Sequence, residues 1–442
     1  MNNNRALSVT EQAMELLNRQ QGSFNIVTIS RIKGDIKEEI LRQVLDAVQS
    51  IHPLLNSRII GTLDHLEFTN QGTEKVPLRV VSQGINDNWE DVVREELNKA
   101  IDSSKVLLRC VLIYKQSEIN ISYLITTVHH GISDGLSCIS LQSEILKCYQ
   151  IIASGDSIDR DCESAIPPLE ELLPKWMKGK NGIDKGKWFL LKTKLQMLLH
   201  QPEQLESEET VPLEFRSCGM THRFLQKELT QKLIELCRQE NTTVQGVLCA
   251  AMLLTVGNKI RGEKLRSIKV SCRTYVDLRR RISPPIQQKN LGFLASFLTS
   301  LHKIKPQMSF WDLSREVTKN IELGLKIKDD IFKPLTLFRK IIEYHINNPD
   351  ESYVTIAVTN IGRVNIPEVY GDLEIEEISF IASNAIIGKV FTVATATFQD
   401  KMLLNFLASK PSLSQETIEM LATGVINCLI EVCQEKVIMA VK

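Results

Sequence analysis

Alternating and periodic apolar positions predict both strands and helices in the first third of the chain. Residues 25–33 (NIVTISRIK) alternate β-branched with polar side chains, as a half-buried strand does. From Asp35 onward, apolar residues recur at helical spacing, and Asp35 with Glu38 forms a D-x-x-E pattern that predicts a capping box. Residues 107–114 and 119–128 are β-rich runs separated by the polar segment KQSE, which predicts a hairpin covered on both faces.

The composition changes between residues 154 and 211. Pro167, Pro168 and Pro174 precede a stretch that carries seven lysines between positions 175 and 194. A proline-rich and lysine-rich segment of this kind is typical of a crossover between two lobes.

The second part of the chain repeats the mixture of helices and strands. The patterns predict helices at 230–240 and 243–257, strands at 267–278 and 353–360, a hairpin at 391–407 and a closing helix at 413–434. We therefore expect an α/β (α+β) protein with three parts. These are an N-terminal lobe at 1–160, a crossover linker at 161–210 and a C-terminal lobe at 211–442.

Composition and charge exclude several classes of protein. The 442 residues are 43% hydrophobic and 24% charged, as in ordinary soluble globular proteins. The 53 basic residues equal the 53 acidic ones, so the chain lacks the excess positive charge that nucleic-acid binding needs. The apolar run at 247–256 is much shorter than the roughly 20 residues that cross a bilayer. We expect no nucleic-acid partner and no transmembrane segment.

The termini and the cysteines indicate the compartment. The N-terminal residues lack the apolar centre of a secretory signal. The ten cysteines include no C-x-x-C pair, and several lie inside apolar runs, where free thiols behave as small hydrophobic groups. We expect a cytoplasmic protein without a metal site.

One segment, HHGISDG at residues 129–135, is hard to explain by packing. It lies between a predicted strand and a predicted helix. A histidine at a strand exit can accept a proton from an alcohol or an amine, and flanking glycines permit close approach of the backbone. Asp134 can orient an imidazole or pair with a cation. Two other interpretations stay open here, a structural histidine beside a core strand and a pair of metal ligands, although no further ligand lies close in sequence.

The segment HHGISDG resembles the HHxxxDG signature of an acyltransferase superfamily. That superfamily includes chloramphenicol acetyltransferase, the condensation domains of nonribosomal peptide synthetases, plant BAHD acyltransferases and polyketide-associated acyltransferases. Three further stretches are similar to it, in order along the chain: the opening segment up to His52, Pro53, Leu54 and Arg58; residues 274–298 (TYVDLRRRISPPIQQKNLGFLASFL); and residues 358–371 (VTNIGRVNIPEVYG). The chain has neither the D-F-G-W-G of plant BAHD enzymes nor the N-V-P-G-P of bacterial wax ester synthases.

The resemblance implies a fold and a mechanism. The fold would be two chloramphenicol-acetyltransferase-like lobes, each a mixed β-sheet with flanking helices, with an active-site channel between them. His130 would be the catalytic base that deprotonates the acceptor, which attacks the donor directly. Asp134 would pair with an arginine of the second lobe, for which Arg279 is the candidate.

The resemblance assigns structural roles to the other residues of the motif. His129 would be structural, Gly135 would serve the turn, and Gly131 would leave room for the acceptor. It assigns no bound cofactor, no cofactor-binding residues and no metal ligands.

The resemblance also implies an activity in natural product biosynthesis. An acyl group would pass from a thioester, acyl-CoA or an acyl carrier protein as co-substrate, to the hydroxyl of a small-molecule acceptor. Two alternatives stay open: a free-standing condensation enzyme that forms an amide from an amine, and a catalytically silent relative that binds carrier proteins.

The lysine-rich crossover allows more than one interpretation. Its lysines could attract the phosphates of coenzyme A or an acidic carrier protein, or belong to a solvated linker. The apolar residues at 188–199 could form a lid over an acyl chain, a helix that touches a membrane, or part of the core.

Overall fold

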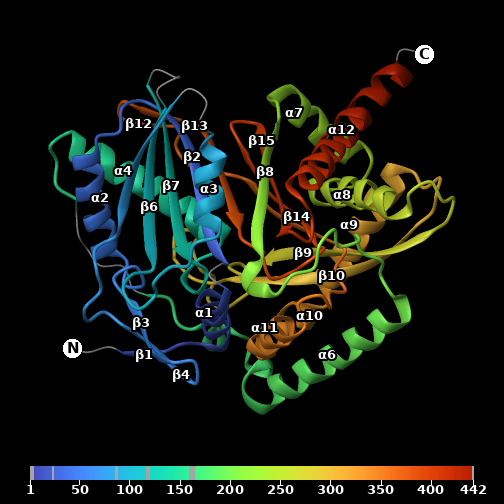
Figure 1. Ribbon diagram of the computed structural model, residues 1–442, viewed down its shortest axis with the longest axis horizontal. Helices are drawn as coiled ribbons and strands as arrows, with labels where there is room; N and C mark the ends of the chain where they lie inside the picture. The colour runs from blue at the N-terminus through green and yellow to red at the C-terminus, as the bar shows by residue number, and fades with distance from the viewer. Residues whose placement is uncertain (1–3, 22–23, 85–87, 116–119, 159–164, 441–442) are drawn as a thin grey trace. The chain divides into compact units, whose positions relative to one another are not determined.

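The computed structural model describes residues 4–21, 24–84, 88–115, 120–158 and 165–440, which form two compact units. Unit 1 comprises Met1–Pro174, Leu278–Leu294 and Val364–Ser383. Unit 2 comprises Lys175–Asp277, Ala295–Arg363 and Asn384–Lys442. The chain passes between the units several times (Figure 1).

Unit 1 is built on a six-stranded mixed sheet. Its strand order is β12 (Val369–Tyr370), β13 (Leu373–Ala382), β2 (Asn25–Lys33), β7 (Ile121–His129), β6 (Leu108–Lys115) and β5 (Leu78–Gln83). β5 and β6 are parallel and the other neighbours are antiparallel. A smaller sheet contains β1 (Arg5–Ala6), β4 (His65–Thr69) and β3 (Arg58–Thr62). The helices are α1 (Val9–Gln21), α2 (Glu38–Ile51), α3 (Trp89–Leu97), α4 (Gly135–Ala153) and α5 (Leu169–Leu172), with the 3₁₀ turn η1 (His130–Ile132).

Helices cover both faces of this sheet. On β7, the Thr127 hydroxyl donates to Glu96 of α3 at 2.7 Å, and the Thr126 hydroxyl donates to Gln142 of α4 at 2.8 Å. Successive side chains of a strand point to opposite faces, so α3 and α4 lie on opposite sides of the sheet. His129 lies two residues after Thr127 on the same strand, so its side chain points to the same face of the sheet, the face that α3 covers.

Unit 2 is built on a second six-stranded mixed sheet. Its strand order is β10 (Ala295–Ile304), β9 (Ile268–Asp277), β11 (Ile356–Arg363), β14 (Phe391–Phe398), β15 (Lys401–Lys410) and β8 (Ser217–Leu225). β11 is parallel to both β9 and β14. Its helices are α6 (Gly179–His200), α7 (Lys227–Gln239), α8 (Val244–Arg261), α9 (Phe310–Lys326), α10 (Lys328–Phe332), α11 (Phe338–Asn347) and α12 (Gln415–Ala440). Three 3₁₀ turns, η2 (Lys175–Met177), η3 (Leu213–Phe215) and η4 (Lys333–Leu337), complete it.

The core of unit 2 explains why α8 is apolar on all sides. The α8 residues between Val247 and Leu253 are fully buried in one cluster with apolar side chains from the sheet and from α12. A helix that is surrounded by protein needs no polar face.

These two mixed sheets with flanking helices confirm the predicted fold class. The predicted hairpin at 107–128 is β6 and β7, although its KQSE turn lies largely outside the described residues. The predicted half-buried strand, β2, is instead buried over most of its length, because β13 and β7 pair with its two edges and helices cover both faces. The predicted capping box is wrong: α2 begins after Lys37, and no side chain caps it.

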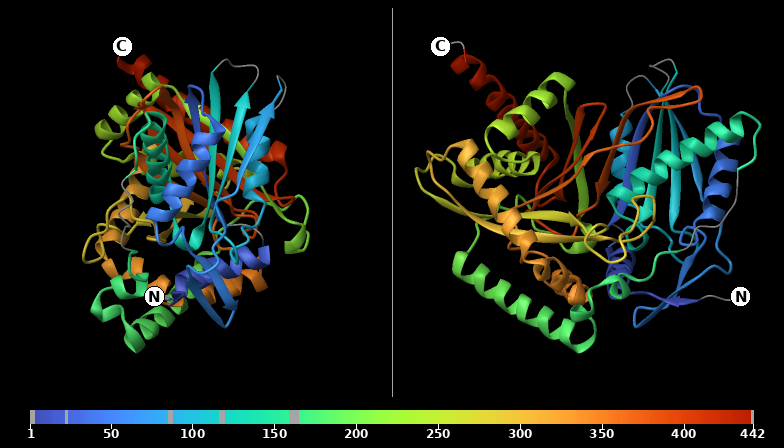
Figure 2. Two further views of the ribbon diagram at one scale, coloured as in Figure 1. Left: turned by 90° about the vertical axis from the view of Figure 1, so that its left-hand side faces the viewer. Right: turned by 180° about the vertical axis from the view of Figure 1, so that it is seen from behind.

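The observed units also differ from the expected division at residues 160 and 211. Residues 278–294 and 364–383, expected in the C-terminal lobe, belong to unit 1. β13 pairs along its length with β2 through backbone hydrogen bonds, and Figure 2 shows the orange β13 beside the blue β2. The expected linker also contains a helix of 22 residues, α6, which belongs to unit 2.

Among the described residues, no single helix is long and apolar enough to cross a membrane. The helices α7 and α8 are long and apolar enough only when they are taken together, and the chain bends by 101° between them.

Candidate active site

The histidine motif lies where β7 ends and α4 begins in unit 1. β7 ends at His129, the 3₁₀ turn η1 holds His130 to Ile132, and Asp134 is the N-cap of α4. The Ser133 hydroxyl donates to the carbonyl of His129 at 3.0 Å and closes this short connection. The sequence thus positions both histidines by backbone geometry at a strand exit, as predicted.

His130 has one ring nitrogen engaged with the backbone. Its Nδ1 lies 2.9 Å from the carbonyl oxygen of Ser133, which can only accept a hydrogen bond. The proton of the neutral ring therefore resides on Nδ1, and Nε2 carries the lone pair. Burial lowers the pKa of His130 below its ordinary value of 6.5, against the opposing effects of the Ser133 carbonyl and the Asp134 charge. The rings of His130 and Phe293 pack edge to face, with centroids 5.1 Å apart. A neutral imidazole with a lone pair at Nε2 can act as a general base.

His129 is fully buried and is held at both ring nitrogens. Nδ1 accepts from the backbone N–H of Gly131 at 3.1 Å, and Nε2 lies 2.9 Å from Oε2 of Glu15 in α1. Oε1 of Glu15 accepts from the Ser103 hydroxyl at 2.6 Å. Burial raises the pKa of Glu15, but His129, Ser103 and Arg19 together hold it below the ordinary value. With both nitrogens engaged, His129 has the environment of a structural residue.

Asp134 connects three parts of unit 1. Its Oδ1 accepts from the backbone N–H of Ser137 at 3.0 Å, and the Ser137 hydroxyl accepts from the Asp134 N–H at 2.9 Å, so the two residues form a capping box. The backbone N–H of Leu294 donates to Oδ2 at 3.2 Å. Arg279 donates from Nη1 to Oδ2 at 2.7 Å and from Nη2 to Oδ1 at 3.0 Å. Burial opposes the charge on Asp134, but these donors hold its pKa below the ordinary value.

The ion pair that the resemblance implies between Asp134 and Arg279 is therefore present. One detail of that expectation is corrected, because Arg279 lies in unit 1 with Asp134 and not in a second lobe. The role of the pair in a reaction stays a prediction, as does the expected channel.

The two glycines of the motif are explained by close packing. A Cβ on Gly131 would lie 3.0 Å from the ring of His129, so this glycine leaves room for His129. A Cβ on Gly135 would lie 2.6 Å from the Phe380 ring of β13. The structure thus gives Gly135 a packing role against Phe380, where the sequence suggested a turn.

Sequence reasoning missed Glu15, Phe293, Leu294 and Phe380. Glu15 is fully buried and lies among apolar residues of α1, so a carboxylate inside an apolar stripe was a usable signal. No local signal connects the other three with residues 129–135, since they come from segments more than 150 residues away.

Comparison with known protein sequences finds relatives for part of the chain. Residues 216–408 match a family model described as the phthiocerol/phthiodiolone dimycocerosyl transferase C-terminus. A linear gramicidin synthase of Brevibacillus parabrevis is 24% identical over 269 residues, which are 55% of this chain and 5% of that protein. The match covers only a small part of these curated relatives, 5% of the length of this synthase and 1% of the length of a second relative.

Solved structures share the fold over nearly the whole chain. Polyketide synthase associated protein 5 from Mycobacterium tuberculosis superposes with a TM-score of 0.70 at 18% identity, over 97% of each chain. Trichothecene 15-O-acetyltransferase from Fusarium sporotrichioides gives a TM-score of 0.75 at 11% identity, over 96% of this chain and 95% of that one. At such low identity the likeness establishes the fold, and it agrees with the fold expected from the motif.

Proposed function

We propose that this chain belongs to the superfamily of condensation domains and chloramphenicol-acetyltransferase-like acyltransferases, and that it transfers an acyl group from a thioester to a hydroxyl. The match of residues 216–408 to the family model and the fold shared with the solved structures support this proposal. The donor would be acyl-CoA or an acyl carrier protein, and the acceptor a small molecule. His130 would be the catalytic residue.

The proposed reaction needs one base and no acyl-enzyme intermediate. Nε2 of His130 takes the proton of the acceptor hydroxyl, and the oxygen attacks the carbonyl carbon of the thioester. The C–S bond then breaks, and the leaving thiolate takes the proton from the imidazolium. An ester and a free thiol result, so atoms and charge balance.

The observation that carries this proposal is the orientation of the His130 ring. The Ser133 carbonyl holds the proton on Nδ1 at 2.9 Å, and Nε2 is thereby kept as an acceptor. Because burial lowers the pKa of His130, the ring is neutral at neutral pH and ready to accept a proton. Asp134 serves this arrangement indirectly: its ion pair with Arg279 and its capping box anchor the chain next to Ser133.

The test is a mass-spectrometric assay of the purified chain with acyl-CoA and acyl-carrier-protein donors against pooled alcohols and amines. We expect an ester product, and we expect His130→Ala to lower turnover by about a hundredfold to ten-thousandfold. The matched control is His65→Ala, because His65 also lies in unit 1 but has a side chain that is 79% exposed. Retained turnover in His130→Ala would contradict the base assignment.

The same assay separates the alternatives. An amide product that His130→Ala abolishes would indicate a condensation enzyme acting on an amine. No product from any donor, together with binding of a carrier protein, would indicate a catalytically silent relative.

A further inference from the structure

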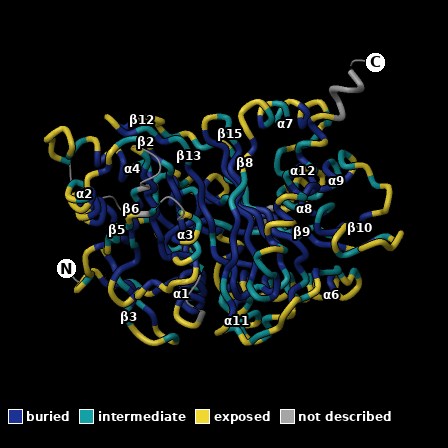
Figure 3. The backbone as a smooth tube through the Cα atoms, turned by 45° about the horizontal axis from the view of Figure 1, so that its top comes forward, coloured by how far each residue is buried: buried dark blue, intermediate teal, exposed yellow. Residues whose placement is uncertain are grey.

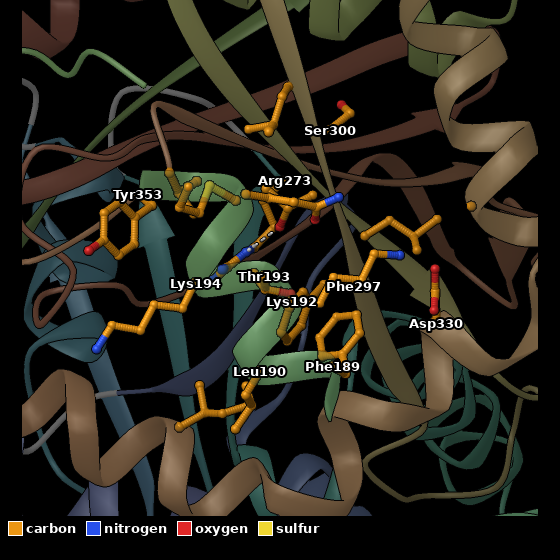
Figure 4. A pocket seen from close by; sticks show the side chains of 18 of the residues that line it. Phe189, Leu190, Lys192, Thr193, Lys194, Arg273, Phe297, Ser300, Asp330 and Tyr353 are labelled. Atoms are coloured by element: carbon orange, nitrogen blue, oxygen red, sulfur yellow. Dashed lines mark hydrogen bonds between the residues drawn. The ribbon is translucent and has the colours of Figure 1, made fainter. Parts of the chain in front are cut away.

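Unit 2 contains a cavity of about 560 Å³ beside the inner face of α6 (Figure 4). Its walls come from α6, β9, β10, α9 and α11. Ligand sites in proteins commonly have volumes of roughly 300 to 1,000 Å³. Much of the wall is apolar, with Phe189 and Met197 from α6, Phe297 and Leu301 from β10, and Ile321 from α9.

One partly buried arginine in this wall has no carboxylate partner among the side chains that the structure describes. Nε of Arg273 donates to the Thr299 hydroxyl at 3.5 Å, and the guanidinium lies 4.4 Å from the centre of the Phe297 ring. Among the residues whose side chains the structure describes, no Asp or Glu forms an ion pair with Arg273, and the phenol of Tyr275 interacts with its guanidinium. Burial lowers the pKa of Arg273, but arginine stays protonated in proteins. A partly buried cation without a counter-ion is unfavourable, so an anionic ligand would relieve this cost.

The other charged groups around the cavity add to its positive character. Lys192, Lys194 and Lys340 contribute to the wall. Asp330 also lines it but pairs with Lys333 at 3.0 Å. His345 is neutral at pH 7, because burial and the charge of Arg273 lower its pKa to about 4.

We propose that this cavity binds a single-chain amphipathic anion. The alkyl chain would lie along the apolar wall, and a carboxylate or phosphate headgroup would accept two hydrogen bonds from the Arg273 guanidinium. This site is separate from the residues of the proposed reaction, and it does not depend on that proposal.

The test is isothermal titration of the full chain with dodecanoate, monododecyl phosphate, dodecanol and dodecyltrimethylammonium, each below its micelle concentration. We expect the two anions to bind, and Arg273→Gln to weaken them about tenfold to a hundredfold with little effect on dodecanol. The relative affinity of dodecanoate and monododecyl phosphate identifies the headgroup.

Two further variants keep the result interpretable. Ile321→Trp places a larger side chain in the cavity and should abolish binding of both anions. The control Arg238→Gln removes an exposed arginine that does not line the cavity and should bind as the wild type does. Equal affinity of Arg273→Gln and the wild type for the anions, or preferred binding of the cation, would overturn the proposal.

The outer face of α6 carries a second, independent observation. Five large apolar side chains on it are more than half exposed: Trp188 (71%), Leu191 (61%), Leu195 (56%), Leu198 (51%) and Leu199 (73%). At 3.6 residues per turn they form one stripe about 100° wide. Figure 3 shows exposed positions, in yellow, on α6. A contiguous exposed apolar patch on a protein surface is typical of an interaction site.

Lysines line both sides of the apolar stripe. By helical spacing, Lys185 and Lys192 lie along one flank, and Lys187 and Lys194 along the other. α6 contains five lysines against one aspartate, a formal net charge of +4. A second copy of the chain would bring like-charged rows together, whereas anionic lipid headgroups would neutralise them.

Two glycines on the inner face of α6 fix which side of the helix faces the protein. A Cβ on Gly182 would lie 1.9 Å from the carbonyl oxygen of Met177, and a Cβ on Gly186 would lie 2.3 Å from the Thr336 hydroxyl. These glycines allow close packing of the helix on η2 and η4, and the packing directs the apolar stripe outward.

We infer that α6 binds the surface of an anionic lipid bilayer. The helix would lie in the plane of the interface, with its leucines and Trp188 among the acyl chains and its lysines at the phosphates. Sedimentation with phosphatidylcholine vesicles, with and without phosphatidylglycerol, tests this.

We expect salt-sensitive binding to the vesicles that contain phosphatidylglycerol. The double variant Leu191→Gln/Leu195→Gln should lower the bound fraction at least tenfold, and Lys185→Gln/Lys187→Gln should remove most of the preference for phosphatidylglycerol. None of these residues lines the cavity. Leu265→Gln is the control, because Leu265 is 92% exposed and lies outside α6.

Binding that the leucine variant leaves unchanged would overturn the membrane proposal. A second contradictory outcome is a wild-type chain that does not bind vesicles but forms a dimer, where the leucine variant is a monomer. That result would assign the apolar stripe to contact with a second copy of the chain. Capture by an acidic carrier protein in place of vesicles would overturn it as well.

Discussion

Arg279 holds both carboxylate oxygens of Asp134 with paired hydrogen bonds of 2.7 and 3.0 Å, although 145 residues separate the two in the chain. Arg279 is 1% exposed and Asp134 is 5% exposed. Breaking a buried ion pair on one side leaves an uncompensated charge, which costs about 3 to 5 kcal/mol. We therefore expect Arg279→Ala to lower the free energy of unfolding by about that amount in urea titrations.

Two further variants calibrate this prediction. Arg279→Lys should also be destabilised, because an ammonium group cannot donate in the planar, two-pronged geometry. Lys75→Ala breaks the exposed pair between Lys75 and Asp46 and should cost less than about 1 kcal/mol. An Arg279→Ala protein as stable as Lys75→Ala would show that the pair is not buried in solution.

The same pair predicts how stability changes with pH. The folded-state pKa of Asp134 is lowered, so its carboxylate contributes stability that is present above the unfolded pKa and is lost as the pH falls through the folded one. Asp134→Asn should be less stable than the wild type at pH 7. The difference in free energy of unfolding between Asp134→Asn and the wild type should shrink as the pH is lowered below about 4. A deficit that is independent of pH, measured by urea titration at several pH values, would contradict this assignment.

His130 predicts the pH dependence of the proposed reaction. Because burial lowers the pKa of His130, the neutral base predominates at pH 6.5 and above, and it becomes protonated only at a pH below this ordinary value. The profile of kcat/KM should be flat near neutrality and reach half of its maximum below pH 6.5. His65→Ala should keep this profile. A half-maximum above pH 6.5 would argue that another group is the base.

The carboxylate of Glu15 should stabilise the folded protein through its contact with His129. Glu15→Ala removes the carboxylate at 2.9 Å from Nε2 of His129 and should cost about 1 to 3 kcal/mol of stability, since a buried polar group loses its partner. Glu15→Gln keeps an oxygen acceptor and should cost less. Urea titration of both variants measures which one is less stable. Equal stabilities of Glu15→Ala and Glu15→Gln would contradict a specific role of the side-chain oxygen.

Gly135 and Phe380 predict a coupled pair of substitutions. Gly135→Ala places a methyl group 2.6 Å from the Phe380 ring and should destabilise the protein by about 1 to 3 kcal/mol. Phe380→Leu makes room, so the double variant should be more stable than the sum of the single effects predicts. A double-mutant cycle measures this coupling, and strict additivity would contradict the contact.

Much of the local structure was predictable from the sequence, for a local reason. Apolar periodicity and turn residues act among neighbours, so they indicated β2, the hairpin of β6 and β7, and the burial of α8. They also placed His130 at the junction of a strand and a helix. The capping box at Asp35 failed because its pattern is short and the backbone begins α2 after Lys37.

The apolar residues of α6 show where a pattern becomes ambiguous. The sequence allowed a core helix, a lid or a membrane contact, since all three need large apolar side chains. The structure divides them, with Phe189 and Met197 at the cavity and Trp188, Leu191 and Leu195 outward. Only the packing of Gly182 and Gly186 decides which face turns inward.

The sequence by itself determined several local elements, the motif and the kind of chemistry that the motif supports. The tertiary structure alone decided that β13 pairs with β2, that Glu15 meets His129, and that Arg279 joins the unit of Asp134. The reason is physical: strand pairing uses backbone N–H and C=O groups that every residue shares, so the side-chain pattern of a strand does not name its distant partner. Contacts between buried charges depend on that pairing, and they appear only once the chain is folded.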